Sequence, residues 1–233
     1  MKKTKVLSIV VIFFVSLFLI LPGCRTIFKD YFVFLQAYFL KPSSIGAIVP
    51  STAFLANAVT KHIDINNQNN LESVKILEVG AGTGVMTEKI LEKLRPQDIL
   101  DVVELDPEFC KILKDKFKKY KNIKIYNISI LDWNPNYSYN YIISGLPFNS
   151  FNHDFLKSVL NKYKTLVVPG GIISYFEYIA LAKIKLFFLT GQEKTQFSQT
   201  ITTTDQFVNQ YEFDNEKVFA NIPPAQVHHL TVS

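Results

Sequence analysis

The chain has 233 residues, of which 48% are hydrophobic and 19% charged. This composition excludes an intrinsically disordered protein, and the length allows one domain with a substantial hydrophobic core. The net charge of +5 favours anionic partners, either phospholipid headgroups or RNA. The two cysteines, Cys24 and Cys110, provide no disulfide framework, and the four histidines do not cluster in the sequence with cysteines or carboxylates. We therefore expect no bound metal.

An apolar run from residue 6 to residue 22 follows three lysines near the start of the chain. Its length reaches the lower limit for crossing a bilayer core, which takes about 20 residues. Three interpretations stay open: a membrane anchor, a cleaved signal peptide, or a lipoprotein signal, since residues 21–24 resemble the lipobox of bacterial lipoproteins. We therefore treat residues 1–24 as a separable segment and residues 25–233 as the main domain.

A second apolar segment, residues 27–40, is rich in aromatic residues and carries its charges at its ends. It is too short to span a bilayer. It predicts a helix lying in the membrane interface, with a helix that packs on the domain core as the alternative. Farther along, Ser51 is expected to cap a helix over residues 52–62, and residues 64–70 are expected to form a polar linker.

From residue 74 onward, short apolar runs alternate with amphipathic stretches. This alternation predicts a parallel sheet covered by helices on both faces, and residues 210–232 predict a closing antiparallel hairpin. The other expected elements are strands at 74–79, 99–104, 123–127, 141–144, 165–168 and 172–176, the last two around a Pro-Gly-Gly turn, and helices at 83–94, 107–119, 151–162 and 180–189.

The most specific motif is a glycine-rich loop that directly follows one predicted strand and precedes a helix. It begins with Glu78 and places glycines at Gly80, Gly82 and Gly84. Glycines allow positive φ angles and a close approach of the backbone to a ligand. The dinucleotide-binding pattern G-x-G-x-x-G fits poorly, because its last glycine would fall on Val85. The loop instead resembles motif I of the class I S-adenosylmethionine methyltransferases, which implies a Rossmann-like α/β fold with a mostly parallel seven-stranded sheet.

The next two predicted strands supply further candidates for cofactor binding. Glu104 ends its strand about 20 residues after the loop, the separation expected of a carboxylate that accepts hydrogen bonds from a ribose. Asp106 is more suited to capping the following helix. After the third strand, Ser129 aligns with the position that bonds the adenine amino group in the methyltransferases, with Asp132 as a substitute, and Ile130 is expected to pack on the adenine ring.

The segment after the fourth strand bears on the substrate. Adenine-amino methyltransferases carry Asn or Asp at its key position, where the side chain accepts hydrogen bonds from the target amine, followed by an aromatic residue that stacks on the flipped base. Here the key position is Gly145, and the aromatic residue is Phe148. Recognition of a base by the usual route is therefore missing.

Four blocks, at residues 41–51, 78–84, 144–148 and 221–225, together resemble the bacterial phospholipid N-methyltransferases, relatives of the ribosomal RNA adenine dimethylases. The resemblance covers nearly the whole main domain. It implies stepwise methylation of phosphatidylethanolamine with S-adenosylmethionine as cofactor, and an N-terminal helix that docks on the bilayer. It also implies cofactor contacts from Gly46, Ser51, Ser144 and Leu146. The apolar run at residues 6–22 departs from the family.

Methyl transfer to an amine is a direct displacement, so catalysis depends on positioning and desolvation rather than on a covalent nucleophile. The amine must first lose its proton, because a primary alkyl amine resembles lysine, whose pKa is about 10.4. The candidates for taking this proton are His153 and a tyrosine of the predicted interfacial helix, Tyr38 or Tyr31. Phe148 is the candidate apolar or cation–π wall.

We therefore expect an N-methyltransferase that acts on a phospholipid amine at an anionic membrane surface, on the cytoplasmic face of the bacterial inner membrane, where its cofactor is made. Nucleic acid is not the expected partner. One alternative is methylation of RNA or protein, which the lysine-rich stretch 111–121 favours and Gly145 opposes. The other is a membrane-anchored binding module with a decayed cofactor site, which the presence of both the glycine loop and Glu104 opposes.

Overall fold

The structure is a computed structural model that describes residues 52–63, 72–179, 181–221 and 224–232. The predicted anchor, interfacial helix and linker lie outside these residues, as do Tyr38, Gly46 and Ser51. Within the described part, no helix combines the length and the apolar character needed to cross a bilayer.

Seven strands form one mixed sheet in the order β3-β2-β1-β4-β5-β7-β6. The first five are parallel to one another, whereas β7 runs antiparallel to both β5 and β6. This arrangement confirms the predicted Rossmann-like sheet with an antiparallel hairpin at its end. The strands are β1 (Lys75–Val79), β2 (Ile99–Glu104), β3 (Ile123–Asn127), β4 (Tyr139–Ser144), β5 (Val167–Tyr178), β6 (Glu212–Val218) and β7 (Ala225–Thr231).

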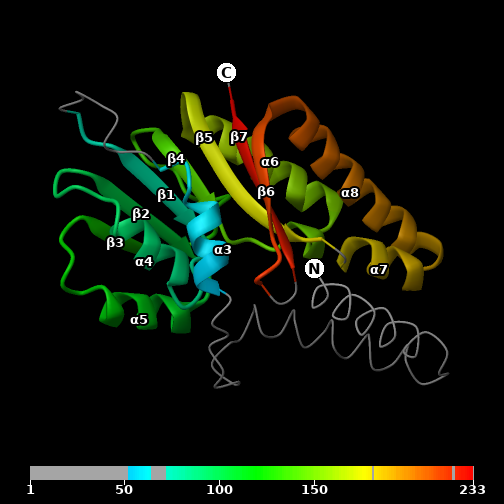
Figure 1. Cartoon of the computed structure of the whole chain (residues 1–233), viewed down its shortest axis with the longest axis horizontal. Helices are drawn as coiled ribbons and strands as arrows, with labels where there is room; N and C mark the ends of the chain where they lie inside the picture. Colours follow the sequence, from blue (N-terminus) through cyan, green and yellow to red (C-terminus); the bar gives the residue numbers. More distant parts are fainter. Residues whose placement is uncertain (1–51, 64–71, 180, 222–223, 233) are drawn as a thin grey trace, which may run out of the picture. The chain divides into compact units, whose positions relative to one another are not determined.

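Helices cover both faces of the sheet (Figure 1). Helices α3 (Thr52–Val59), α4 (Val85–Leu91) and α5 (Pro107–Lys116) lie on one face, and α6 (His153–Leu166) and α8 (Gly191–Tyr211) lie on the other. A 3-10 turn at Phe148–Ser150 precedes α6, and α7 (Leu181–Phe188) follows β5. Successive strand residues alternate between the faces: Ile76 packs in the cluster below α3 and α4, and Leu77 packs in the cluster below α6.

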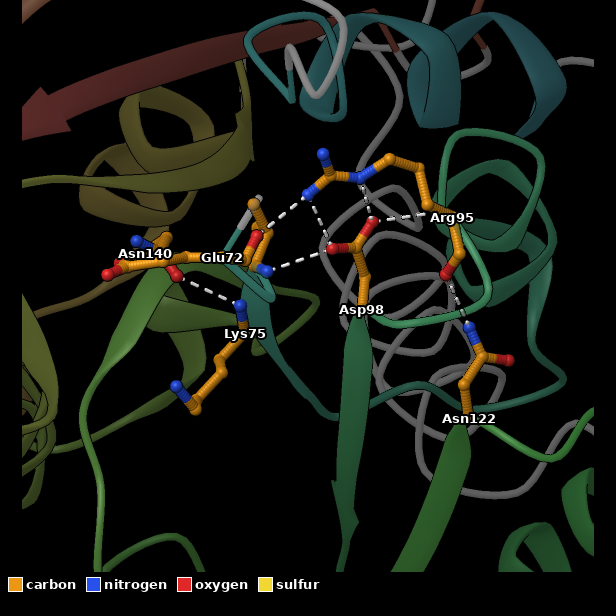
Figure 2. A network of polar contacts seen from close by, with 7 residues as sticks. Glu72, Lys75, Arg95, Asp98, Asn122 and Asn140 are labelled. Atoms are coloured by element: carbon orange, nitrogen blue, oxygen red, sulfur yellow. Dashed lines mark hydrogen bonds and ion pairs between the residues drawn. The ribbon is translucent and has the colours of Figure 1, made fainter. Parts of the chain in front are cut away.

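A polar network joins the segments at the amino ends of β1, β2 and β4 (Figure 2), whereas the glycine loop follows the carboxyl end of β1. The buried carboxylate of Asp98 accepts hydrogen bonds from the backbone N–H of Val74 at 2.8 Å and from the guanidinium of Arg95 at 2.8 and 3.0 Å. The side chain of Asn140 likewise accepts from the N–H of Lys75 at 2.9 Å. The contacts from Arg95 and the backbone amides hold the pKa of Asp98 below its usual value although burial opposes them. This edge is fixed by polar contacts, which leaves the opposite edge for ligands.

Two elements differ from the sequence-based expectation. Residues 169–171 do not form a turn between two strands but lie inside β5, where they shift its register against β4 between Tyr139 and Tyr141. Gly171 permits the irregularity, since a Cβ atom there would lie 2.6 Å from a methyl group of Val167. Helix α8 has no counterpart in the prediction, because its many threonines are weak helix formers.

Candidate cofactor and substrate site

The glycine loop connects β1 to α4, and its three glycines all have positive φ angles: 72° at Gly80, 54° at Gly82 and 84° at Gly84. Two of them are also required by packing. A Cβ atom on Gly80 would lie 2.8 Å from the side chain of Leu146, and one on Gly84 would lie 2.7 Å from the ring of Phe117. At Gly82, by contrast, a Cβ atom would meet no described atom within 4 Å. The loop is therefore closed on two sides and open at its middle glycine.

Glu104, at the carboxyl end of β2, is bonded to this loop. One carboxylate oxygen accepts a hydrogen bond from the N–H of Gly82 at 2.9 Å, and the other accepts from the N–H of Asp106 at 3.0 Å. A carboxylate offers about four lone-pair positions, so capacity remains for ligand hydroxyls. Asp106 caps α5 by accepting from the N–H groups of Glu108 and Phe109. Glu104 thus lies beside the loop, and Asp106 has the capping role expected of it.

Glu78, on β1 just before the loop, is fully buried. Its Oε2 accepts a hydrogen bond from the hydroxyl of Thr87 at 2.6 Å, while its Oε1 has no hydrogen-bond partner among the described residues. Burial raises the pKa of Glu78 to about 8, and the nearby charge of Glu104 adds to the rise. A protonated or half-protonated acid therefore lies under the loop at neutral pH.

The residues after β3 that are expected to contact the adenine are less accessible than the sequence suggests. The hydroxyl of Ser129 accepts a hydrogen bond from the N–H of Leu131 at 3.2 Å, which is a local turn contact. Ile130 is 5% exposed and packs in the core cluster below α6. Little of the Ile130 side chain is left for contact with an adenine ring, whereas Ser129 is only half-buried.

The segment after β4 meets the loop at Gly145. The N–H of Gly145 donates to the carbonyl of Val79 at 2.8 Å, and a Cβ atom on Gly145 would lie only 2.4 Å from the carbonyl oxygen of Gly80. Ser144 is buried, and its hydroxyl accepts from the hydroxyl of Tyr163 at 2.9 Å. Leu146 packs on Gly80. Leu146 therefore shapes the loop, and Ser144 anchors the strand end to α6.

Of the predicted catalytic side chains, Phe148 is buried more deeply than expected, whereas His153 is partly exposed. Phe148 is 2% exposed, and its ring centroid lies 4.7 Å from that of Tyr175, so its ring belongs to the core rather than to a surface wall. Phe151 is the neighbouring half-buried aromatic residue, and it contacts Phe155 edge-on at 4.8 Å. His153 begins α6, and its Nδ1 lies 2.9 Å from the hydroxyl of Thr203 on α8.

A buried polar group behind Phe148 escapes sequence reasoning. Tyr175 stacks on the imidazole of His228 with ring centroids 5.0 Å apart, and its hydroxyl has no partner within the described residues. His228 contacts the carboxylates of Glu212, at 2.5 Å, and Glu177, at 3.5 Å. Burial lowers the pKa of His228, but the two carboxylates outweigh it and raise the pKa above its ordinary value. The pairing of β5 with β7 places Tyr175 opposite His228. Their spacing in the sequence gives no sign of this contact.

Although the histidines are dispersed in the sequence, the fold brings three of them close to carboxylates. Besides the group around His228, the ligand atoms of His62, Asp214 and His229 all lie within 4.8 Å of one another. Hydrogen bonds from Lys61 and His62 lower the pKa of Asp214 to about 2. Burial and the neighbouring His62 lower the pKa of His229 to about 4. These residues lie on separate segments that the sheet brings together.

The loop fits S-adenosylmethionine on three observations. Space is open at Gly82, where a side chain would meet nothing described. Glu104 lies beside that space with acceptor capacity for ribose hydroxyls. Below it, Oε1 of the buried Glu78 has no hydrogen-bond partner among the described residues and is available to a polar group of the ligand.

A sequence model of the ribosomal RNA adenine dimethylases matches residues 51–173. The chain belongs to this family. The ribosomal RNA adenine dimethylase family is a class I methyltransferase family, so this member is a methyltransferase whose cofactor is S-adenosylmethionine. Family membership describes the fold and the methyl donor, and it leaves the acceptor open.

Known relatives of this family member differ in the acceptors that their names give. An ornithine lipid N-methyltransferase of Singulisphaera acidiphila is 27% identical over 149 residues, which cover 61% of this chain and 75% of the relative. The ribosomal RNA small subunit methyltransferase A of Borrelia garinii is 35% identical over 98 residues, which cover 41% and 34%. A malonyl-[acyl-carrier protein] O-methyltransferase of Ilyobacter polytropus is 27% identical over 123 residues, which cover 53% and 46%. The chain thus spans less than half the length of the last two relatives.

Solved structures agree with this family's fold. The N-methyltransferase NodS from Bradyrhizobium japonicum, in complex with S-adenosyl-L-homocysteine, superposes with a TM-score of 0.55 at 14% identity, over 78% of this chain and 84% of NodS. TrmN from Thermus thermophilus superposes with a TM-score of 0.54 at 15% identity, over 85% and 53%. At these identities the superpositions bear on the fold alone.

Proposed function

We propose that the chain transfers methyl groups from S-adenosylmethionine to the amine of a membrane lipid, with phosphatidylethanolamine as the first acceptor to test. The observation that carries this proposal is the contact between Gly145 and Gly80. At the position where adenine methyltransferases place an Asn or Asp, a Cβ atom would lie 2.4 Å from a backbone carbonyl oxygen, closer than real Cβ contacts come. A base-recognising side chain therefore has no room without a shift of the cofactor loop.

The lipid acceptor also draws support from a relative. The name of the Singulisphaera acidiphila relative gives it an aminolipid as acceptor, and the aligned region takes in 75% of that protein. The relative named for ribosomal RNA aligns over a shorter part of this chain, 41%. A lipid amine needs no stacking platform or hydrogen-bonding Asn, which agrees with a glycine at position 145.

Exposed apolar side chains at the cofactor edge support a site that works at a membrane surface. Leu105 directly follows β2 and Glu104, and it is 69% exposed. Phe219, in the turn after β6, is 71% exposed. This turn lies near the carboxyl end of β5, because Val218 pairs with Ala225 and Ala225 pairs with Tyr178. The edge that carries the loop therefore also presents apolar side chains suited to the boundary between headgroups and acyl chains.

Different residues of the site bind the methyl donor and take the proton of the acceptor amine. When bound, the cofactor supplies an electrophilic methyl group, and the acceptor amine attacks it without a covalent enzyme intermediate. Glu104 and the loop hold the donor. The ammonium must release its proton, and the candidate acceptor is His153, whose Nδ1 lies 2.9 Å from the hydroxyl of Thr203. We assign the anionic, cytoplasmic membrane surface as the place of reaction.

The acceptor is tested with the purified full chain and S-adenosylmethionine carrying a labelled methyl group. Vesicles of phosphatidylethanolamine, vesicles that contain ornithine lipid, and ribosomal RNA are offered in parallel. We expect label in a lipid fraction and none in RNA. Label in RNA alone would reject the proposal and would favour the activity named for the Borrelia garinii relative.

Membrane contact at this edge is tested by flotation with anionic vesicles. A Phe219→Ala variant should bind vesicles more weakly than the unchanged chain. Tyr120→Ala is the matched control, since Tyr120 is also exposed but lies beside the amino end of β3, at the opposite edge. Equal flotation of both variants and the unchanged chain would mean that another surface holds the membrane.

A further inference from the structure

Three residues from distant parts of the chain meet beside the C-terminal hairpin. His62 follows α3, Asp214 lies on β6, and His229 lies on β7 opposite Asp214. Nε2 of His62 lies 2.7 Å from Oδ2 of Asp214. The imidazole rings of His62 and His229 contact edge-on, with their centroids 4.4 Å apart. Strands β4 and β5 lie between β7 and β1, so this group is separate from the cofactor loop.

The state of His229 is the observation that points to a ligand. Its side chain is fully buried, its Nδ1 lies 2.7 Å from the hydroxyl of Ser174, and its Nε2 has no hydrogen-bond partner in the described structure. Leaving a buried polar atom without a partner costs free energy, so such atoms are rare unless something else satisfies them. A metal bond at Nε2 would satisfy it, with the Nδ1–H donating to Ser174 as an outer contact that fixes the ring.

We infer that His62, Asp214 and His229 bind one divalent transition-metal ion, with zinc as the first ion to test. Two imidazoles and one carboxylate are a ligand set that zinc uses, and a water molecule can take the fourth position. Zinc lies about 2 Å from each ligand atom, which keeps the ligand atoms roughly 3.3 Å apart in a tetrahedron. Binding therefore needs the 2.7 Å contact between His62 and Asp214 to open slightly and His229 to approach.

One neighbouring charge opposes the binding of a cation at this group. The ammonium of Lys61 lies 2.9 Å from Oδ2 of Asp214 and opposes a second cation there. Lys61 is 45% exposed, however, and also lies 3.6 Å from the carboxylate of Glu216, so it can turn to that partner. The side chains of His62 and Asp214 are 27% and 32% exposed, which gives an ion a path from solvent.

A bound ion would join the segment after α3 to the β6–β7 hairpin. These parts lie about 150 residues apart in the chain, so the ion would close a long loop, and its binding free energy would add to the stability of the folded domain. The site would be structural and would need no part in methyl transfer.

The test uses the untagged full chain, purified with a chelator in detergent micelles and then titrated with zinc against a chromophoric chelator. We expect one zinc ion per chain and a rise in Tm on binding. His229→Ala and Asp214→Asn should each weaken zinc binding at least about tenfold and abolish the rise in Tm. Ser174→Ala, which removes the outer contact, should weaken it by roughly 10- to 100-fold. Cobalt should give the visible absorption of a tetrahedral site.

His153→Ala is the control, because it removes a histidine outside the group and should leave zinc binding unchanged. S-adenosylmethionine binding, measured on each variant by calorimetry, shows whether the variant is folded. His62→Ala changes a partly exposed residue and gives a second variant if His229→Ala fails to fold. Absence of stoichiometric zinc in the unchanged chain, or equal zinc affinity in the unchanged chain and a folded His62→Ala or Asp214→Asn variant, would overturn the inference.

Discussion

The backbone N–H of Gly82 donates a hydrogen bond of 2.9 Å to the carboxylate of Glu104. This bond links the open middle of the glycine loop to the end of the neighbouring strand. The residue that is expected to hold the ribose therefore also holds the loop in place, and the two functions should fail together.

Replacement of Glu104 with Gln should weaken S-adenosylmethionine binding about 10- to 100-fold. The amide offers one acceptor oxygen instead of two, and its NH2 group would face the N–H of Gly82 or of Asp106. Calorimetric titration measures the loss. Asp106→Asn is the control: it keeps a capping side chain on α5, so it should bind the cofactor nearly as well as the unchanged chain. An unchanged affinity in Glu104→Gln would refute the assigned role.

The open space at Gly82 predicts a graded response to substitution. Gly82→Ala adds a methyl group that meets no described atom, but the φ of 54° makes alanine strained there by about 1–2 kcal/mol. Gly82→Asp adds, in the same strained backbone, a side chain that fills the space and a charge close to Glu104. We expect Gly82→Ala to retain weakened binding of S-adenosylmethionine and Gly82→Asp to lose it, as measured by equilibrium dialysis. Equal affinity of the two variants would contradict the loop assignment.

Gly145→Ala should damage cofactor binding although position 145 lies on another strand. The new Cβ atom would lie 2.4 Å from the carbonyl oxygen of Gly80, so the loop or the end of β4 has to move. We expect a Kd for S-adenosylmethionine that is raised at least about tenfold, together with a lower Tm. Gly145→Asn should behave in the same way and should gain no activity on RNA. An active, RNA-methylating Gly145→Asn variant would show that the backbone tolerates the side chain.

The raised pKa of Glu78 makes stability depend on pH with a defined sign. The folded state keeps the proton up to about pH 8, whereas the unfolded chain releases it near the ordinary value of 4.5. The folded state therefore binds more protons in this window, and the free energy of unfolding falls as pH rises from about 4.5 to about 8. In Glu78→Gln this part of the pH dependence should disappear. Urea denaturation of both proteins at several pH values measures it, and parallel profiles would refute it.

Removal of the Asp98 carboxylate should destabilise the fold without changing the cofactor site. Asp98→Ala removes the acceptor of the N–H of Val74 and the carboxylate contacts of Arg95, while Arg95 keeps its bond to the carbonyl of Glu72 (Figure 2). We expect a loss of about 2–4 kcal/mol in the free energy of unfolding and an unchanged Kd for S-adenosylmethionine. Because the pKa of Asp98 is lowered, its contribution to stability is present above about pH 4 and is lost as pH falls through its folded-state pKa.

The parts of the fold that local sequence determines could be predicted. Strands β2 and β3 and the start of α5 at Pro107 lie where the apolar runs and the Asp-Pro cap put them. Helix α8 could not be predicted from propensity, since it is held by buried residues at helical spacing, among them Phe197, Thr200 and Thr204. The continuous β5 depends on Gly171 packing against neighbouring backbone, which is a tertiary constraint.

The same division applies to the candidate site. The glycine loop and Glu104 are recognisable because a strand, a turn and the next strand end are close in sequence and have fixed spacing. The groups around His228 and His229 are not recognisable in this way. His62 and Asp214 lie 152 residues apart and meet only because α3 packs against β6 and β7, while the pairing of β6 with β7 places His229 opposite Asp214. The burial of Phe148 is likewise a property of packing against Tyr175.

The strand order has a consequence for how the protein is made. Strand β6 is synthesised before β7, yet β7 separates it from β5. While a ribosome is still extending the chain before residue 225, β5 has an unpaired edge and β6 has nothing to join. The two final strands therefore have to dock as a hairpin, or β7 has to bind first, and until then a nascent chain presents an open sheet edge that invites chaperones or aggregation.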